Sequence, residues 1–418
     1  MTVVEGFLST PEALEAFGER SFVDAMLRFE AALARAQAKV GLISQASADT
    51  IASTCKVDLF NVPKIVRDSG QAGSLAIPLV KALKETVGLF SQEAVPATHF
   101  GSTSQDVIDT AMALVSQPVL ALVLADGEAI LEALLRLTDR HADTPMLART
   151  LGQPASVTSF GWKCALWAGG LQRGLQRLRQ AAPPALAVQL GGAVGTQAQL
   201  QGQGSRVVAL MADELGLSAP ATPWHTQRDA WVALGCALGG LVGTLGKVAR
   251  DLSLMTQFEV SEISEPSGDS RGGSSAMPHK RNPVACMVAL AAAQRAPLSV
   301  AGLLAAMPQE HERALGHWQA ELAEWSQLML SAHGSARALA GALPGLQVHV
   351  PRMRANLDAL RATLPPEAAE EWFDPALAVQ AGRLARAELL RLRALQATRP
   401  VDASIDRPID RPIHRQTD

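Results

Sequence analysis

The feature that most constrains the fold is a series of long segments with the composition and periodicity of helices. They are about 25 to 35 residues long, which exceeds the usual length of a helix in a globular protein. They run over residues 107–141, 156–182, 229–257, 283–306 and 318–343. Because aromatic residues make up only 4% of the chain and hydrophobic residues 48%, Ala and Leu must fill the core, which favours helices over sheets. We therefore predict an all-α protein with a central bundle of long helices.

Helical periodicity is clearest over residues 22–40, where apolar side chains recur every three or four positions and Gly41 ends the run. Shorter helices are predicted at 353–364 and 375–395, and no segment shows the alternation of a β-strand. We expect loops, in which a site could be assembled, where proline, glycine and polar residues gather. These breaks fall at 144–145, 183–184, 218–223 and 265–275.

These segments predict three helical domains and a tail. Residues 1–106 would form an N-terminal domain, and residues 107–343 a central domain that contains a long loop at 262–283. Residues 344–398 would form a small C-terminal domain. Residues 399–418 repeat the sequence Ile-Asp-Arg-Pro, and their density of proline and charge predicts a disordered tail.

Charge and cysteine content argue against several classes of partner. The formal net charge of -3 gives no reason to expect nucleic acid or an anionic membrane. The four cysteines lack the spacing of a disulfide or metal framework, so we expect reduced thiols, no metal and a cytoplasmic location. Residues 1–10 lack the pattern of a secretory signal. The apolar segment 230–246 is shorter than the ~20 residues that span a bilayer, so we interpret it as a buried bundle helix.

The most informative local sequence is Gly-Gly-Ser-Ser-Ala-Met-Pro-His-Lys-Arg-Asn-Pro at residues 272–283. The paired glycines allow a close approach of the backbone to a ligand, and the two prolines stiffen the segment that follows. Lys280 and Asn282 can donate hydrogen bonds to an anion, and Ser274 or Ser275 can transfer a proton if its alkoxide is stabilised. Taken alone, a solvated Gly/Ser turn before a helix is the commoner explanation of such a sequence.

These twelve residues resemble the signature GSSxMPxKxNP of the fumarase/aspartase superfamily. Its members make or break a C–O or C–N bond beta to a carboxylate. The resemblance implies that Ser274 is the proton-transfer residue and that Lys280 and Asn282 hold a carboxylate of the substrate.

A second sequence, His-Phe-Gly-Ser-Thr-Ser-Gln-Asp at residues 99–106, precedes a predicted long helix. Taken alone, Ser104 or Asp106 is most simply a helix N-cap. The sequence resembles the first conserved block of the superfamily. By that resemblance Thr103 and Ser104 bind a carboxylate of the substrate, and His99 lies beside the substrate as a further catalytic candidate.

The second superfamily block usually reads Thr-His-x-Gln, and its histidine takes part in acid/base chemistry. The similar sequence in this chain runs from Arg149 to Ala155 and has Leu151 in place of that histidine. Leucine cannot carry a proton, so another group must replace it. Gln153 keeps its place as a hydrogen-bonding residue, and we expect it to bind the substrate.

A third cluster contains Glu310, Arg313 and His317, which would share a face if this segment is helical. On spacing alone a surface ion-pair face is the simpler explanation, although Arg313 is a plausible additional anion contact. The stretch is similar to one that holds the nucleotide in adenylosuccinate lyases. However, Gly316 and Leu322 stand where those proteins have serine and arginine. The chain also contains no tyrosine and therefore lacks their N-terminal Arg-Tyr phosphate motif, so a nucleotide substrate is poorly supported.

Within the superfamily, these blocks look most like those of the bacterial cycloisomerases of carboxylated muconates, over residues 20–345. The resemblance implies lactonisation of a small tricarboxylate in protocatechuate catabolism, the β-ketoadipate pathway, without a cofactor. It also implies a homotetramer with active sites shared between subunits. The alternatives are an adenylosuccinate-lyase-like eliminase and a catalytically inactive structural homologue. Retention of Ser274, Lys280 and Asn282 argues against the inactive homologue.

Overall fold

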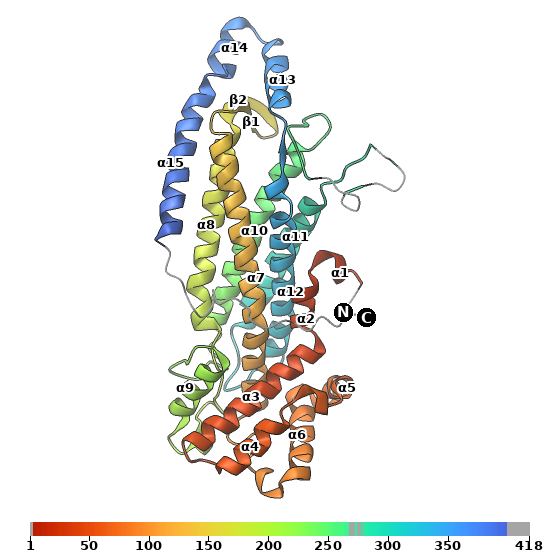
Figure 1. The fold of residues 1–418 in the computed structure, drawn as a ribbon, viewed down its shortest axis with the longest axis vertical. Coiled ribbons are helices and arrows are strands. Elements are labelled where there is room, and N and C mark those ends of the chain that lie inside the picture. Colours follow the sequence, from red (N-terminus) through yellow and green to blue (C-terminus); the bar gives the residue numbers. More distant parts are fainter. Residues whose placement is uncertain (1–2, 267–271, 274–276, 278, 399–418) are drawn as a thin grey trace.

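Long helices form a bundle that runs along most of the molecule (Figure 1). The computed structural model describes residues 3–266, 272–273, 277 and 279–398. The bundle contains α7 (Ser104–Arg140), α8 (Phe160–Ala185), α10 (Asp229–Met255), α11 (Val284–Ala306) and α12 (His317–Ala340). α11 packs against α10 and α12, and α7 packs against α8 and α12. The predicted all-α fold with a bundle of long helices is confirmed.

Shorter helices cover the lower end of the bundle in Figure 1. They are α3 (Glu19–Lys39), α4 (Gln45–Thr54), α5 (Val62–Ala72), α6 (Ala76–Phe90) and α9 (Gly204–Leu215). α3 matches the periodicity predicted over residues 22–40, and its apolar stripe packs against α7. Two small helices, α1 (Glu5–Leu8) and α2 (Pro11–Ala16), lie beside α12.

The upper end of the bundle carries a β-hairpin and the C-terminal helices (Figure 1). The hairpin consists of β1 (Pro145–Thr150) and β2 (Gln153–Ser159), and α13 (Val350–Arg361) and α14 (Pro366–Phe373) pack against it. α15 (Leu377–Ala397) returns along α8. α13 and α15 confirm the two shorter helices predicted from the sequence. A second small sheet pairs β3 (Ile263–Ser264) with β4 (Gln347–Val348).

The hairpin corrects the prediction that the chain contains no strand and that a helix begins at residue 156. Thr150 pairs with Gln153, so the strands are joined by a two-residue turn. Leu151 and Gly152 both have positive φ, at 52° and 78°, as a type I′ turn requires. Burial in β1 follows no strict alternation, because the strand buries the neighbours Met146 and Leu147. Strand periodicity is therefore missing from the sequence.

The predicted break at Pro183–Pro184 is also wrong, because both prolines lie inside α8. The helix ends at Ala185, so the two missing N–H donors fall in its last turn. Proline is costly in the middle of a helix, where the lost hydrogen bond and the clash with the preceding turn bend the backbone. In the last turn of a helix a proline costs less, because few backbone hydrogen bonds follow the turn that it disturbs.

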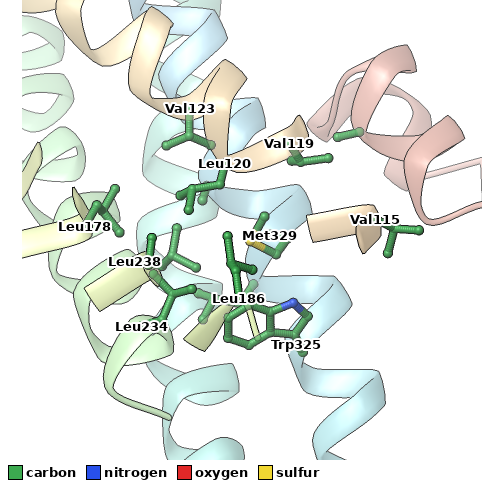
Figure 2. Packing of buried hydrophobic residues seen from close by; sticks show 14 of the residues in the cluster. Val115, Val119, Leu120, Val123, Leu178, Leu186, Leu234, Leu238, Trp325 and Met329 are labelled. Carbon is green, nitrogen blue, oxygen red and sulfur yellow. The ribbon is translucent and has the colours of Figure 1, made fainter. Parts of the chain in front are cut away.

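The core of the bundle is filled by aliphatic side chains around Trp325 (Figure 2). Trp325 is fully buried, and its indole N–H donates to Ser116 Oγ on α7 at 2.8 Å. Around it pack aliphatic side chains from α7, α8 and α10. Gly235 allows α10 to approach α11, because a Cβ there would lie 2.5 Å from Leu303 Cδ1.

On length and composition alone, α7, α10 and α11 are each apolar enough to cross a membrane. Most of the apolar window is buried inside the chain for α7 (78%) and α10 (61%), but α10 keeps an exposed face, with Cys236 and Gly240, within the segment 230–246 that the sequence predicts to be buried. Only 33% of the window in α11 is buried, and Met287, Leu298 and Leu304 are exposed. A single chain therefore leaves one apolar side of the bundle uncovered.

Candidate active site

The N-terminus of α7 forms the first part of the candidate site. Thr103 is the N-cap residue, with an extended backbone (φ −137°, ψ 164°), and Ser104 begins the helix. The N–H of Thr103 donates to Asp106 Oδ2 at 3.0 Å. The first turn of a helix has unpaired N–H groups and the positive end of the helix dipole, so it suits a carboxylate ligand. The structure thus places Thr103 and Ser104 together at a helix end that can bind an anion.

Asp106 lies buried beneath this helix end and fixes the neighbouring loop. Its Oδ1 accepts hydrogen bonds from Gln189 Nε2 (3.1 Å) and from the N–H of Gly191 (2.9 Å). Its Oδ2 accepts from the N–H of Gly192 at 2.9 Å. Burial raises the pKa of Asp106 to about 6, while these N–H donors favour the ionised form. The loop around Gly191 is therefore held against the start of α7.

A buried guanidinium beneath the same site joins α7 to α12. Arg228 donates to both oxygens of Asp109, at 2.8 and 3.2 Å, and to Glu321 at 3.1 Å. The indole N–H of Trp318 donates to Asp109 at 2.9 Å. Burial disfavours the charge on Arg228, but the two carboxylates outweigh this effect and raise the pKa of Arg228. Burial also raises the pKa of Glu321.

Arg313 reaches this network from the loop before α12. Its Nε donates to Gln105 Oε1 at 3.3 Å, and its Nη2 donates to the carbonyl of Ala193 at 3.2 Å. Gln105 Nε2 donates in turn to Asp109 Oδ2 at 3.2 Å and to the carbonyl of His225 at 2.7 Å. Arg313 is exposed, so its remaining N–H groups face a region that a ligand can enter. The structure therefore brings Arg313 to the same end as Thr103 and Ser104.

The condition under which Glu310, Arg313 and His317 would share a face, a continuous helix, is not met. α12 begins only at His317, and Gly316, which precedes it, has a φ of 99° that breaks any continuous helix. Glu310 Oε1 still lies 3.3 Å from His317 Nδ1, because the loop folds back on itself.

His99 lies on the loop that leads into α7. Its Nδ1 is 2.6 Å from Glu30 Oε1 and 3.0 Å from Ser102 Oγ. Burial by itself would lower the pKa of His99, but the charge and the hydrogen bond of Glu30 together outweigh burial and raise it. His99, Thr103 and Ser104 are thus within one short segment at the lower end of the bundle.

Gln153 lies at the opposite end, where it begins β2 and is exposed. Leu151, which stands in place of the superfamily histidine, is fully exposed at the tip of the hairpin. Arg149 donates to both carboxylate oxygens of the buried Glu262, at 3.0 and 3.3 Å. Glu262 Oε1 also accepts from Asn356 Nδ2 at 3.1 Å. The hairpin is therefore tied to the segment that precedes residues 272–283.

Ser274 lies outside the described residues, as do Ser275, Ala276 and Pro278 of the signature sequence. The carbonyl of Gly272 accepts from the N–H of Asn282 at 2.8 Å, which closes the loop at its base. Gly272 has a φ of 71°, and a Cβ there would lie 2.5 Å from the carbonyl oxygen of Asn282, so only glycine fits. Lys280 is exposed and Asn282 is half-buried.

Within one chain, the two groups of predicted site residues are far apart. α7 has 37 residues, and at 1.5 Å per residue it is about 55 Å long. Thr103 precedes its first residue, whereas the hairpin with Gln153 follows its last. Figure 1 shows the start of α7 at the lower end and the hairpin at the upper end. One chain therefore cannot bring Thr103, Ser104 and Gln153 to the same small ligand.

A model of the lyase family matches residues 7–298. The chain belongs to this family. It is 45% identical over 352 residues to the 3-carboxy-cis,cis-muconate cycloisomerase of Pseudomonas aeruginosa, covering 84% of this chain and 77% of that protein. It is 44% identical over 361 residues to the protein of the same name from Bradyrhizobium diazoefficiens, covering 86% of this chain and 80% of that protein.

A solved structure from the same family has the same fold. The 3-carboxy-cis,cis-muconate lactonizing enzyme of Pseudomonas putida matches with a TM-score of 0.81 and 36% identity, covering 95% of this chain and 91% of that one. The resemblance seen in the signature sequence is thereby confirmed. This chain is an enzyme of the fumarase/aspartase type.

The sequence did not reveal the buried charged residues that support the site segments at the two ends of the helix bundle. They are Glu30, Asp109, Arg228, Glu262 and Glu321. One signal was available, because a charged residue inside an apolar helical stripe is rarely buried unless it is paired. Partners such as Arg228 and Asp109 are 119 positions apart, so local patterns do not reveal them. Among the residues that the structure describes, no group of three His, Cys, Asp or Glu side chains is placed to hold a metal ion.

Proposed function

We propose that this chain converts 3-carboxy-cis,cis-muconate to 4-carboxymuconolactone in cytoplasmic catabolism of aromatic compounds. The observation that carries the proposal is the 45% identity, over 84% of the chain, to the cycloisomerase of Pseudomonas aeruginosa. The lactonizing enzyme of Pseudomonas putida supports it through a fold that is shared over 95% of the chain. The eliminase alternative lacks this support, and Leu322 stands where adenylosuccinate lyases are expected to have an arginine.

The reaction needs fixed hydrogen-bond donors and one proton. A carboxylate oxygen of the substrate forms a C–O bond with a carbon of the diene, and the π electrons move toward the carbon next to another carboxylate. A proton then forms the new C–H bond at that carbon. Between C–O bond formation and protonation, negative charge builds up on the carboxylate attached to that carbon. Preorganised hydrogen-bond donors stabilise this charge. The nucleophile belongs to the substrate, so orientation contributes much of the rate.

The residues of this chain can take the required roles. Ser274 is the candidate that delivers the proton, and Lys280 and Asn282 are the candidates that hold a carboxylate. Thr103 and Ser104, at the N-terminus of α7, would bind a second carboxylate. Further contacts would come from the predicted site residues Gln153 and Arg313, and from His99.

Purified protein is expected to convert 3-carboxy-cis,cis-muconate without added metal or nucleotide. The conjugated diene absorbs in the ultraviolet and the lactone absorbs much less, so the fall in absorbance reports turnover. Adenylosuccinate should not be cleaved under the same conditions. Cleavage of adenylosuccinate with no change in carboxymuconate would contradict the proposed function.

We further propose that the protein acts as a homotetramer whose sites combine segments of different subunits. The separation of about 55 Å between the ends of α7 supports this, because a small tricarboxylate cannot bridge it. The uncovered apolar side of α11 supports it too, since Leu298 is 73% exposed in a single chain. A groove of about 500 Å³ between α8 and α10, lined by Gly170, Gly240 and Gly243, leaves room for a close helix contact.

Shared sites predict complementation between inactive variants. Ser274→Ala and Gln153→Ala place their defects in different segments, so mixed tetramers contain some sites in which every contributing segment is wild type. Unfolding and refolding the two variants together should restore part of the lost activity, measured with carboxymuconate. Each variant refolded alone serves as the control. An active monomer in light scattering, or mixed tetramers no more active than the separate variants, would exclude shared sites.

A further inference from the structure

α3 presents two buried polar side chains to the loop that precedes the candidate anion site. Glu30 and Gln37 are seven positions apart, which is about two helical turns, so they lie on one face of the helix. Glu30 Oε1 lies 2.6 Å from His99 Nδ1, and Gln37 Nε2 donates to the carbonyl of Phe100 at 2.6 Å. The exposed fraction is 1% for Glu30 and 0% for Gln37.

The contact between Glu30 and His99 carries two free-energy costs that a contact serving stability alone would not be expected to carry. Glu30 lies in an apolar helical face between Phe29 and Leu33, and its Oε2 is buried without a hydrogen-bond partner among the described residues. Leaving a buried polar atom unpaired costs about 1–3 kcal/mol. His99 also has a φ of 64°, which is unfavourable for a residue with a side chain. Costs of this kind persist at functional sites, where the surrounding structure enforces the conformation.

The contacts decide which atom of the ring is left for a ligand. Among the described residues, Glu30 and Ser102 make the hydrogen-bond contacts to the ring, and both contact Nδ1. Nε2 is therefore the ring nitrogen left for a ligand. A histidine whose Nδ1 faces a carboxylate has its tautomer and ring orientation set by that partner. The charged groups around the ring are Glu30 on α3, Asp106 on α7 and Lys84 on α6, so two anions face it against one cation.

We propose that Glu30 is a positioning residue, which acts through Nδ1 to orient the ring of His99. Nε2 then donates a charge-assisted hydrogen bond to a substrate carboxylate at the N-terminus of α7. This inference rests on the proposed function, because it assigns the ligand as a carboxylate of that substrate. His99 precedes Thr103, the N-cap residue of α7, by four positions, so both contacts come from one short segment. Helix end and imidazolium would together hold the carboxylate more firmly than either alone.

The pH dependence of Glu30→Gln tests the proposal. Because the pKa of His99 is raised, the ring stays cationic to a higher pH than an ordinary histidine does, and the contact is lost as pH rises through that pKa. Removing the charge of Glu30 lowers the pKa of His99, so the alkaline fall in kcat/KM should begin at a lower pH than in wild type, which leaves a pH window between the two onsets. Within that window KM should rise about tenfold, with kcat within about threefold of wild type, because the contact is made already in the bound ground state. Glu30→Asp keeps the charge and should restore part of the wild-type profile.

Glu214→Gln is the matched control, because Glu214 also contacts α3, through Arg35, but is not among the charged groups around His99. Its pH profile should be that of wild type. A folded Glu30→Gln variant with an unshifted alkaline limb would overturn the proposal. If Glu30→Gln does not fold, the His99→Gln variant tests the proposal instead. Its kcat/KM should show no alkaline fall, because the titrating ring is gone. Persistence of the limb at the wild-type pH would again overturn the proposal.

A measurement without substrate separates this inference from the proposed function. Because folding raises the pKa of His99, the pair stabilises the folded state fully below the ordinary histidine pKa of about 6.5. That stabilisation is lost as pH rises through the raised pKa. The difference in melting temperature between wild type and His99→Gln should therefore shrink with rising pH, and a constant difference would overturn the pairing. Wild-type protein that shows this trend but leaves carboxymuconate unchanged would refute the proposed function and its substrate contact, but not the pairing.

Discussion

Replacing Ser274 by alanine is expected to lower kcat by at least ~100-fold, with little change in KM. The factor is the usual loss for a positioned group that transfers a proton in the transition state. KM should hold because the resemblance assigns the binding of the substrate to Lys280, Asn282 and the helix end, not to this hydroxyl. Steady-state kinetics with carboxymuconate, followed by ultraviolet absorbance, measures both constants.

Ser275→Ala is the matched control for this substitution, since it removes the same hydroxyl one position along the same loop. It should retain most of the wild-type kcat. A Ser274→Ala enzyme with nearly normal kcat would remove Ser274 from the mechanism. Loss of activity in Ser275→Ala instead would move the proton transfer to that neighbour.

Much of the bundle could be predicted from the sequence, because its helices are long and carry their own signals. Residues 107–141 and 229–257 became α7 (Ser104–Arg140) and α10 (Asp229–Met255), with ends that differ by three residues or fewer. Long helices hold their apolar residues in a pattern that few other structures share. Their burial depends on the sum of many contacts, so single exceptions such as Pro118 inside α7 do not change the outcome.

The hairpin and the buried charges could not be predicted, because tertiary contacts decide them. β1 and β2 are stabilised by packing against α13, α14 and α15, which lie some 200 residues further along the chain. The sequence identified the segments at which a ligand would bind, such as residues 99–106. It did not identify Glu30 or Arg228, which support those segments from distant parts of the chain.

Replacing Arg228 by methionine should destabilise the fold more than any substitution of a surface charge. Arg228 is the guanidinium bound to the buried carboxylates of Asp109 and Glu321, whose side chains are 1% and 0% exposed. Removing it leaves two anions close together in a medium that solvates them poorly. Breaking a buried ion pair in this way costs about 3–5 kcal/mol of unfolding free energy. A large fall in the urea midpoint would report the loss.

Arg20→Met is the control, because Arg20 pairs with Asp58 at the surface, where both side chains are more than half exposed. An exposed pair contributes about 0–1 kcal/mol, so its urea midpoint should hardly move. If uncompensated charge causes the loss at Arg228, adding Glu321→Gln to Arg228→Met should recover part of it. A double variant no more stable than Arg228→Met would mean that lost packing, not charge, destabilises the protein.

The same variant has a defined pH dependence. Burial already raises the pKa of Glu321, and without Arg228 nothing opposes that effect, so the folded variant binds a proton more tightly than the unfolded chain does. A carboxyl with a raised folded pKa stabilises the protein below its unfolded pKa of about 4.3, and the benefit is lost as pH rises. The deficit of Arg228→Met relative to wild type should therefore narrow as pH falls from 8 toward about 5. A stability deficit that widens on acidification would show that the two carboxylates are not the source of the instability.

Loss of the Arg228 guanidinium should disturb the anion site as well as the fold. Asp109 accepts a hydrogen bond from Gln105, and Gln105 accepts one from Arg313, so a shift of Asp109 would pass to Arg313.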